Sequence, residues 1–319
     1  MTSPQATGSE AAGSEMAGSE AIARAPSRPG WERRRIALGR LWRGLRADRA
    51  GLIGLVLLVA FVAVAVAAPL LADRHELLAA TGRGRANLAP PSREFLLGTD
   101  EIGRDVFAQL VWGTRVSLYI GLLANVVAVI IGTSLGLIAG YARGRLSSIL
   151  LGVDDFFLVL PFLPLAVVLA VLLGRSPSVL AVVIGLTSWA GSARLVRAQV
   201  LSIRERGYVE RARALGGGSW HIVARHVLPG VGPLVIATAT LNVAGAILAE
   251  STLSFLGFGD RFSPSWGKVL DGAQSSGAIT RGAWWYYLPP GLCIIAVVLA
   301  FTMLGRALER LLDPRLDGR

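Results

Sequence analysis

The sequence predicts an all-α polytopic membrane protein with six transmembrane helices, and three observations favour this fold class. The chain of 319 residues is 53% hydrophobic, with a mean hydropathy of +0.56. Charged residues make up 17% of it, whereas soluble domains carry about 25%. The apolar residues gather in long runs, near the roughly 20 residues that a helix needs to cross a bilayer core. A soluble globule and a disordered chain are therefore poor fits, and the single Cys293 cannot form an internal disulfide.

The first 49 residues are predicted to lie before the first span, in two parts. Residues 1–30 contain three near-repeats of Gly-Ser-Glu and few large apolar side chains, which is typical of a disordered tail. In residues 31–49, seven arginines alternate with Leu41, Trp42 and Leu45. This pattern predicts a basic amphipathic segment on an anionic membrane surface, and the region has none of the features of a signal peptide.

Six apolar runs then define a transmembrane domain over residues 50–305, followed by a C-terminal tail at 306–319. The third run contains Pro161 and Pro164, which a span tolerates where neighbouring helices satisfy the freed carbonyl groups. The fourth is the shortest. The predicted spans are 50–71, 117–141, 156–173, 178–193, 231–249 and 288–304.

The arginines indicate the orientation of these spans. If the N-terminus is inside, the inner segments hold 22 of the 32 Lys and Arg residues. Because positive charge concentrates in cytoplasmic segments, both termini are expected to be cytoplasmic. Most of the net charge of +11 thus lies in segments predicted to be cytoplasmic. The high positive charge is therefore no argument for nucleic-acid binding.

Some residues inside the spans suggest packing or transport roles. Gly132, Gly136 and Gly140 repeat at four-residue spacing in the second span and predict a flat strip for close helix packing, within the chain rather than in a dimer. Asn125 and Asn242 are predicted to hydrogen-bond between helices, with a place on a substrate path as the alternative.

The acidic residues nearest the spans are expected to reach water. Asp154, Asp155 and Glu250 fall at predicted span ends, so no charged side chain in mid-span marks a proton pathway. This argues against a proton-driven secondary transporter. No cluster of metal ligands and no phosphate-binding loop is present in the sequence, so the chain itself is expected to bind no ATP or metal.

The inner loop 194–230 is unusually long. It predicts a helix over 194–203, a second over 208–215, a break at Gly216-Gly217-Gly218, and a third helix capped by Ser219 and ended by Pro229-Gly230. From the residues alone this is either a protruding lever or a basic surface helix on lipid headgroups.

Part of this loop resembles the coupling loop of ABC-importer permeases, Glu-Ala-Ala-x3-Gly-x9-Ile-x-Leu-Pro. Glu210, Ala212, Gly216 and Leu228-Pro229 match that pattern, whereas Arg211 replaces an Ala and His226 replaces the Ile. The resemblance implies that an ATPase-coupling surface includes Tyr208, Glu210, Ala212, Leu215, Gly216, His226, Leu228 and Pro229.

Further blocks resemble the C-type subunit of the dipeptide/oligopeptide/nickel permease family. They are Leu97–Val106 with Trp112–Leu118, Glu250–Gly259 with Pro264–Gly267, and Leu312–Leu316, and with the basic start the resemblance covers about residues 35–317. The segment Gly98-Thr99-Asp100 reads as a turn, with Thr99 or Asp100 capping a short helix that includes Arg104-Asp105. The blocks before the second span and after the fifth span are expected on the outer side. They either form part of the docking surface for an external protein or close the outer end of the helix bundle.

The resemblance implies a type I ABC importer permease fold in a bacterial inner membrane. It also implies that the chain forms half of the transmembrane pathway for dipeptides or oligopeptides and carries no catalytic residue. The implied partners are a second homologous permease, two cytoplasmic ABC ATPase subunits that hold ATP and Mg²⁺, and an extracytoplasmic solute-binding protein. A proton-driven secondary transporter and a non-transport membrane scaffold are the alternatives.

Overall fold

The computed structural model describes residues 39, 42–77, 86–260 and 262–312. The predicted tail 1–30 lies outside the described residues, as do most of residues 31–41; residues 42–47 are helical. The part of the chain from Leu45 onward forms one compact unit, to which all the labelled helices belong. Its α-helices are α3 (Arg49–Leu71), α4 (Val106–Tyr141), α5 (Arg145–Val159), α6 (Phe162–Leu173), α7 (Pro177–Ser188), α8 (Ala190–Arg204), α9 (Gly207–Ala214), α10 (Ser219–Ile222), α11 (Leu228–Leu253), α12 (Trp266–Ser275) and α13 (Trp284–Leu312).

Three short helical segments complete the described secondary structure. A 3-10 helix, η1, spans Arg74–Leu77, and two π-helical turns, η2 (Val223–Val227) and η3 (Ser254–Phe258), adjoin the two ends of α11. Within the described ranges there is no β-strand, only an isolated bridge between Thr99 and Asp105. The predicted all-α class is therefore confirmed.

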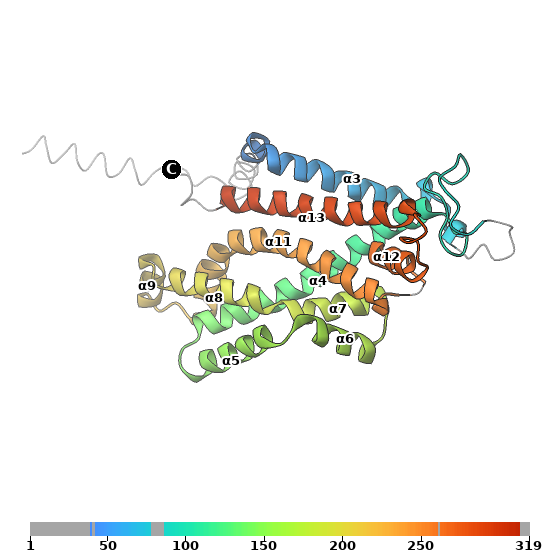
Figure 1. The fold of residues 1–319 in the computed structure, drawn as a ribbon. Coiled ribbons are helices and arrows are strands. Elements are labelled where there is room, and N and C mark those ends of the chain that lie inside the picture. Colours follow the sequence, from blue (N-terminus) through green and yellow to red (C-terminus); the bar gives the residue numbers. More distant parts are fainter. Residues whose placement is uncertain (1–38, 40–41, 78–85, 261, 313–319) are drawn as a thin grey trace, which may run out of the picture. The chain divides into compact units, whose positions relative to one another are not determined.

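Helix α4 is the centre of the bundle. It is 36 residues long and contacts α3, α5, α7, α8 and α11. On one side α13 packs against both α3 and α11, and on the other side α7 and α8 lie against α4 (Figure 1). The helix begins at Val106 because Asp105 caps it, its carboxylate accepting a hydrogen bond from the N–H of Phe107 at 2.9 Å. The short helix predicted before it is absent: residues 98–105 form a loop, and Asp105 rather than Thr99 or Asp100 is the cap.

Four described helices are long and apolar enough to cross a membrane, and two bent pairs bring the number to six if each pair is one span. The four are α3, α4, the continuous run Ser219–Phe258, and α13. The polytopic membrane fold predicted from the sequence is thus confirmed. The second helix begins eleven residues before the predicted 117, and α13 extends to Leu312 into the predicted tail 306–319.

The third predicted span, 156–173, is instead divided between two helices. Helix α5 already begins at Arg145, inside the predicted inner segment, and α6 leaves it at an angle of 93°. The break has a local cause, because a residue that precedes proline is pushed out of the helical region. Leu160 has φ −65° and ψ 128°, and Pro161 caps α6. Pro161 therefore lies at the break between two helices and not inside one continuous helix.

The fourth predicted span, 178–193, also differs from the structure. The chain bends by 46° at Trp189, between α7 and α8, and α8 then continues to Arg204. The end of this span and the predicted helix 194–203 are therefore one helix. Thr187 contributes to the bend, because its hydroxyl donates to the carbonyl oxygen of Val183 at 2.9 Å and so competes with the backbone ladder.

The predicted helix end at Pro229-Gly230 is wrong. The π-helical turn η2 joins α10 to α11, and the helical run continues from Ser219 to Phe258. In this turn the N–H of Leu228 bonds the carbonyl oxygen of Val223, five residues back. The change of register accommodates Pro229, which has no N–H to donate, in the first turn of α11. Gly218, not Ser219, occupies the N-cap position of α10.

The glycine strip of α4 faces α8. A methyl group added at Gly132, Gly136 or Gly140 would lie within 3 Å of α8. At Gly136 the added carbon would lie 2.6 Å from the carbonyl oxygen of Ala193, which is backbone and cannot move aside easily. The strip thus lets two backbones approach within the chain, as small residues do in membrane helix pairs.

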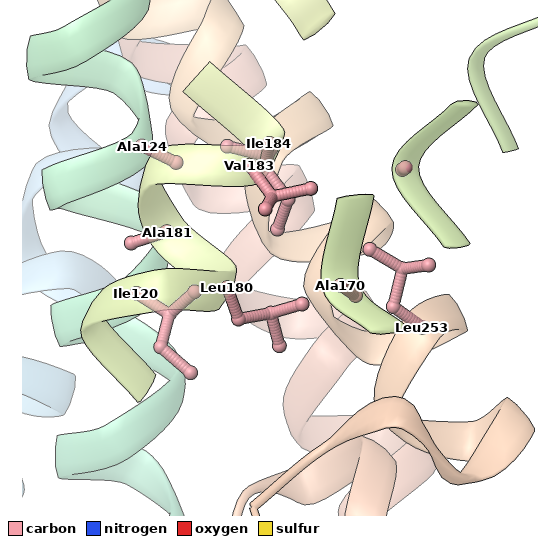
Figure 2. Packing of buried hydrophobic residues seen from close by; sticks show 10 residues of the cluster. Ile120, Ala124, Ala170, Leu180, Ala181, Val183, Ile184 and Leu253 are labelled. Atoms are coloured by element: carbon pink, nitrogen blue, oxygen red, sulfur yellow. The ribbon is translucent and has the colours of Figure 1, made fainter. Parts of the chain in front are cut away.

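A second contact region joins α4, α6, α7 and α11. Alanines alternate there with larger aliphatic side chains, and α7 lies between α4 and the bent α6 (Figure 2). Hydrophobic packing thereby holds α6 against the rest of the bundle although its connection to α5 turns sharply. The cluster includes Ile120, Ala124, Ala170, Leu180, Ala181, Val183, Ile184 and Leu253.

The glycine contact predicts a matched pair of stability effects. Gly136→Ala is expected to destabilise the protein by about 1–3 kcal/mol, because the added carbon overpacks the α4–α8 contact. Gly152→Ala in α5 is the control, since an added carbon there meets nothing within 4 Å and alanine favours the helix. Thermal unfolding in detergent measures both, and equal midpoints for the two variants would contradict the close contact.

Candidate functional site

The segment from α8 to η2, residues 190–227, forms an arm whose hydrophobic core it shares with the start of α11 and the end of α4. Val209 is the buried residue of α9 and anchors that helix to α8 and η2, while Ala212 packs against the edge of the same core. Close packing of this kind holds the arm in one arrangement, unlike a flexible loop. The core consists of Val196, Val200, Ile203, Val209, Ile222, Val227 and Val231.

A tight turn forms the tip of the arm. Gly216 has φ +82°, and its N–H bonds the carbonyl oxygen of Arg213, while the N–H of Gly217 bonds that of Ala212, both at 3.0 Å. These two bonds define a Schellman motif, which ends α9 and requires a left-handed residue at Gly216. Gly217 is also constrained, because an added carbon would lie 2.7 Å from the oxygen of Ala212.

The tip exposes large apolar side chains. Leu215 is 89% exposed and Trp220 is 82% exposed, on either side of the glycine turn. Beside them, the rings of Tyr208 and His226 lie with their centroids 6.1 Å apart. Aromatic and aliphatic side chains exposed together mark an interaction surface. Trp220 was missed in the sequence-based prediction; its signal was a large aromatic residue directly after a glycine-rich turn.

The other residues predicted for the ATPase-coupling surface differ in how far their side chains are exposed. Ala212 and His226 are partly buried, and Leu228 and Pro229 lie in the first turn of α11 rather than in a loop. The structure therefore spreads this predicted set over α9, the turn, η2 and the start of α11. Its exposed members are Tyr208, Glu210, Leu215, Gly216, Leu228 and Pro229.

Polar contacts tie α8 to its neighbours. The guanidinium of Arg194 pairs with Asp154 at 3.3 Å and also with Asp155, both on α5. Farther along α8, Arg204 donates to the carbonyl oxygen of Gly140 at 3.0 Å. Asp154 is buried, so the expectation that it reaches water is wrong, and the ion pair explains how its charge is accommodated.

A half-open cavity of about 270 Å³ lies between α4, α6, α7 and α11. The two amides identified from the sequence, Asn125 on α4 and Asn242 on α11, both line it. The Nδ2 of Asn242 donates to the hydroxyl of Ser192 on α8 at 2.8 Å. The lining residues are all uncharged: Ala124, Asn125, Ala128, Phe162, Ile184, Ser188, Leu241, Asn242, Gly245, Ala246 and Ala249.

Helix α8 therefore connects the cavity with the arm. Its first turn carries Ser192, which touches the cavity through Asn242, and its last turns carry Val200 and Ile203 in the core of the arm. At 1.5 Å per residue its 15 residues span roughly 22 Å. Figure 1 shows α8 between α9 and α7, so one helix reaches from the arm toward the residues that line the cavity.

Comparison with known proteins identifies the fold. A family model described as the inner membrane component of binding-protein-dependent transport systems matches residues 132–318, which include the whole arm. The chain belongs to this family. A second model, the N-terminal transmembrane domain of oligopeptide transport permease C, matches residues 38–91. The sequence-based identification of an ABC importer permease is confirmed, and the protein is a multi-pass protein of the inner membrane.

Several curated relatives align along most of the chain. A dipeptide transport system permease of Bacillus subtilis is 36% identical over 276 residues, covering 86% of this chain and 85% of the relative. A putative peptide transport system permease of Brucella abortus is 38% identical over 280 residues, covering 86% and 90%. A glutathione transport system permease of Pectobacterium atrosepticum is 35% identical over 229 residues, covering 72% and 75%.

Away from the arm, the permease contains a buried polar cluster around Glu250. This carboxylate is fully buried, so the expectation that it reaches water is wrong. It accepts hydrogen bonds from the hydroxyls of Ser254 at 2.7 Å, Ser117 at 3.2 Å and Ser251 at 3.4 Å. Ser117 in turn accepts from the backbone N–H of Trp266, at the start of α12. The carboxylate thus joins α4, α11 and α12.

A second set of carboxylates organises the loop before α4. Asp100 is buried and accepts from the backbone N–H of Arg104 at 2.8 Å and from the side chain of Gln109 at 2.7 Å. Its neighbour Glu101 accepts a hydrogen bond from the hydroxyl of Tyr286 on α13. Three blocks of the family resemblance, 112–118, 250–259 and 264–267, therefore meet at Glu250, and the block 97–106 is bonded to α4 and α13.

Removal of the Glu250 carboxylate is expected to loosen α12. Glu250→Leu leaves several buried hydroxyls without their acceptor, at a cost of about 1–3 kcal/mol for each unsatisfied group. Hydrogen exchange of residues 265–276 should become faster in this variant, and less so in Glu250→Gln. Thr252→Val is the control, because Thr252 is exposed and bonds its own helix at Leu248. Unchanged exchange in Glu250→Leu would show that the cluster does not hold α12.

Proposed function

We propose that this permease forms one half of the transmembrane pathway of an importer for dipeptides or oligopeptides. The observation that carries the proposal is the continuous connection from the exposed tip of the arm, along α8, to the amide-lined cavity. The relatives support the solute class, because they include permeases named for dipeptides, other peptides and glutathione, all of which contain amide bonds.

In this proposal the tip of the arm faces the cytoplasm. Helix α9, the start of α3 and the end of α13 lie at the same end of the bundle (Figure 1), and Arg310 pairs with Asp48 at 2.8 Å there. The segments predicted to be inner carry most of the arginines, as the positive-inside rule requires. Both termini are then cytoplasmic, and α12 with the Glu250 cluster lies toward the outer face.

The energy comes from partner subunits. Two cytoplasmic ABC ATPase subunits bind ATP and Mg²⁺, and the tip of the arm docks on one of them. Trp220 is suited to this contact because tryptophan is enriched among the residues that dominate the energy of an interface, and the exposed Leu215 adds apolar area. The permease itself has no catalytic role.

Two further partners complete the transporter. A second, homologous permease covers the open side of the cavity, where Asn125, Ser188 and Asn242 would be costly to leave in contact with lipid. An extracytoplasmic solute-binding protein delivers the solute at the end that α12 closes. ATP binding closes the ATPase pair, and α8 transmits that movement to the cavity wall, which gives alternating access.

Loss of the tryptophan at the tip tests the docking surface. Trp220→Ala is expected to weaken ATPase binding by about 2 kcal/mol, roughly 30-fold in Kd, as for an interface hot spot. Leu299→Ala is the control, because Leu299 is exposed on α13, away from the arm. Binding of the purified ATPase subunits to permease in nanodiscs measures the effect. Equal affinities for the two variants would remove the tip from the interface.

Purification of the assembly tests the function as a whole. The permease pulled down from native membranes should bring a second permease and ABC ATPase subunits with it. In liposomes that assembly, with its binding protein, should accumulate a labelled dipeptide only when ATP is supplied, whereas the permease alone should hydrolyse no ATP. A non-transport scaffold or a proton-driven transporter predicts no co-purifying ATPase, so its absence would refute the proposal.

A further inference from the structure

An open hollow of about 550 Å³ lies where α3 ends beside the start of α4. The indole Nε1 of Trp112 donates to the carbonyl oxygen of Ala72 at 3.1 Å, which holds the ring against the end of α3. Tryptophan is enriched at membrane–water interfaces, because its ring is apolar and its N–H is polar. A hollow beside such a ring, at the end of a membrane-spanning helix, lies at the level of the lipid headgroups. It is lined by Pro69, Leu70, Leu71, Ala72, Asp73, Arg74 and Trp112.

Two arginines from different helices place their charges against this one indole ring. The guanidinium carbon of Arg74, on η1, lies 5.5 Å from the ring centroid of Trp112, and that of Arg115, on α4, lies 6.0 Å from it. Neither arginine has a carboxylate partner among the ion pairs of the described residues. Two like charges held near each other repel, so the pair favours an anion that both can contact. Asp73 also lines the hollow, and the three charged groups together remain positive.

Helix α3 lies at the edge of the bundle and exposes an aliphatic stripe that leads to the hollow (Figure 1). Val59, Val62, Val66 and Leu70 follow one another at three- and four-residue spacing, so they share one helical face. Exposure increases toward the hollow, with Val66 74% and Leu70 90% exposed. From Val59 to Leu70 the helix rises roughly 16 Å. One leaflet contributes about 15 Å to a bilayer core of ~30 Å, so the stripe has the length of one layer of acyl chains.

We propose that the hollow binds the phosphate of an anionic phospholipid whose acyl chain lies along the stripe on α3. Arg74 and Arg115 contact the phosphate oxygens, because a guanidinium presents several N–H donors in a geometry that matches phosphate. A free phosphate ion would meet the arginines alone, whereas a phospholipid also covers the aliphatic stripe. A zwitterionic lipid fits less well, because its ammonium group adds positive charge to a positive hollow. The inference requires only that the chain spans a membrane and does not depend on the transported solute.

Lipid binding in detergent tests the site. The full-length permease is purified from membranes together with any subunits that it binds, freed of lipid, and titrated with fluorescent phosphatidylglycerol or with phosphatidylcholine of the same chains. The wild type should bind phosphatidylglycerol more tightly. Arg74→Gln and Arg115→Gln should each weaken that binding about fivefold, because a basic side chain near an anionic headgroup contributes about 1 kcal/mol. Arg74→Lys should retain most of the affinity, since it keeps the charge.

Arg175→Gln is the matched control. Arg175 is also an exposed arginine beside an aromatic ring, with its guanidinium carbon 5.8 Å from the ring centroid of Phe258, but it bonds the backbone of Gly257 and does not line the hollow. Its loss should leave the affinity for phosphatidylglycerol as in the wild type.

Two further comparisons complete the test of the lipid site. Inorganic phosphate at the concentration of the lipid should not displace phosphatidylglycerol, because the ion makes no contact with the stripe on α3. Displacement by phosphate would show an anion site without a lipid. Equal affinity for the two lipids, or an equal loss in Arg175→Gln, Arg74→Gln and Arg115→Gln, would also refute the inference.

Discussion

The close contact between α4 and α8 decides how the two ends of this permease communicate. Because Gly132, Gly136 and Gly140 have no side chains, α8 lies directly on the backbone of α4 and cannot be displaced sideways without losing that contact. Arg204 and Arg194 fix it further, the first to α4 and the second to α5. A helix held in this way is a rigid element. It belongs to the arm and, through Ser192, also contacts Asn242 on the cavity wall.

The opposite end of the bundle is stabilised by a different kind of interaction. Glu250 is buried among serine hydroxyls, with no basic side chain bonded to it among the described contacts, and it links α12 to α4 and α11. Hydrogen bonds inside an apolar bundle are directional and costly to break, so they define one arrangement of these helices. The permease thus combines a polar closure at one end with a close glycine contact between α4 and α8 elsewhere in the bundle.

Sequence reasoning located four of the spans and the glycine strip because both depend on local composition. Apolar length predicts a span, and a four-residue glycine repeat predicts close packing, without knowledge of the partner helix. The bend at Pro161 and the π-helical turn before Pro229 depend on how the rest of the bundle holds the chain, so the same residue type breaks one helix and lies within another. Likewise, Glu250 at a span end was expected to reach water, since only the folded structure places Ser117 and α12 over it.

The placement of charged side chains in the bundle bears on which solutes the cavity can accept. Arg194 and Asp154 neutralise each other between α5 and α8, Glu250 is enclosed, and the cavity is lined by neutral groups alone. A charged group in the cavity would have to be hydrated and dehydrated as the pathway opens and closes, which raises the barrier to each movement. Neutral amides avoid this cost and still offer directional hydrogen bonds. A wall of neutral groups therefore suits a pathway that binds its solute weakly and then releases it.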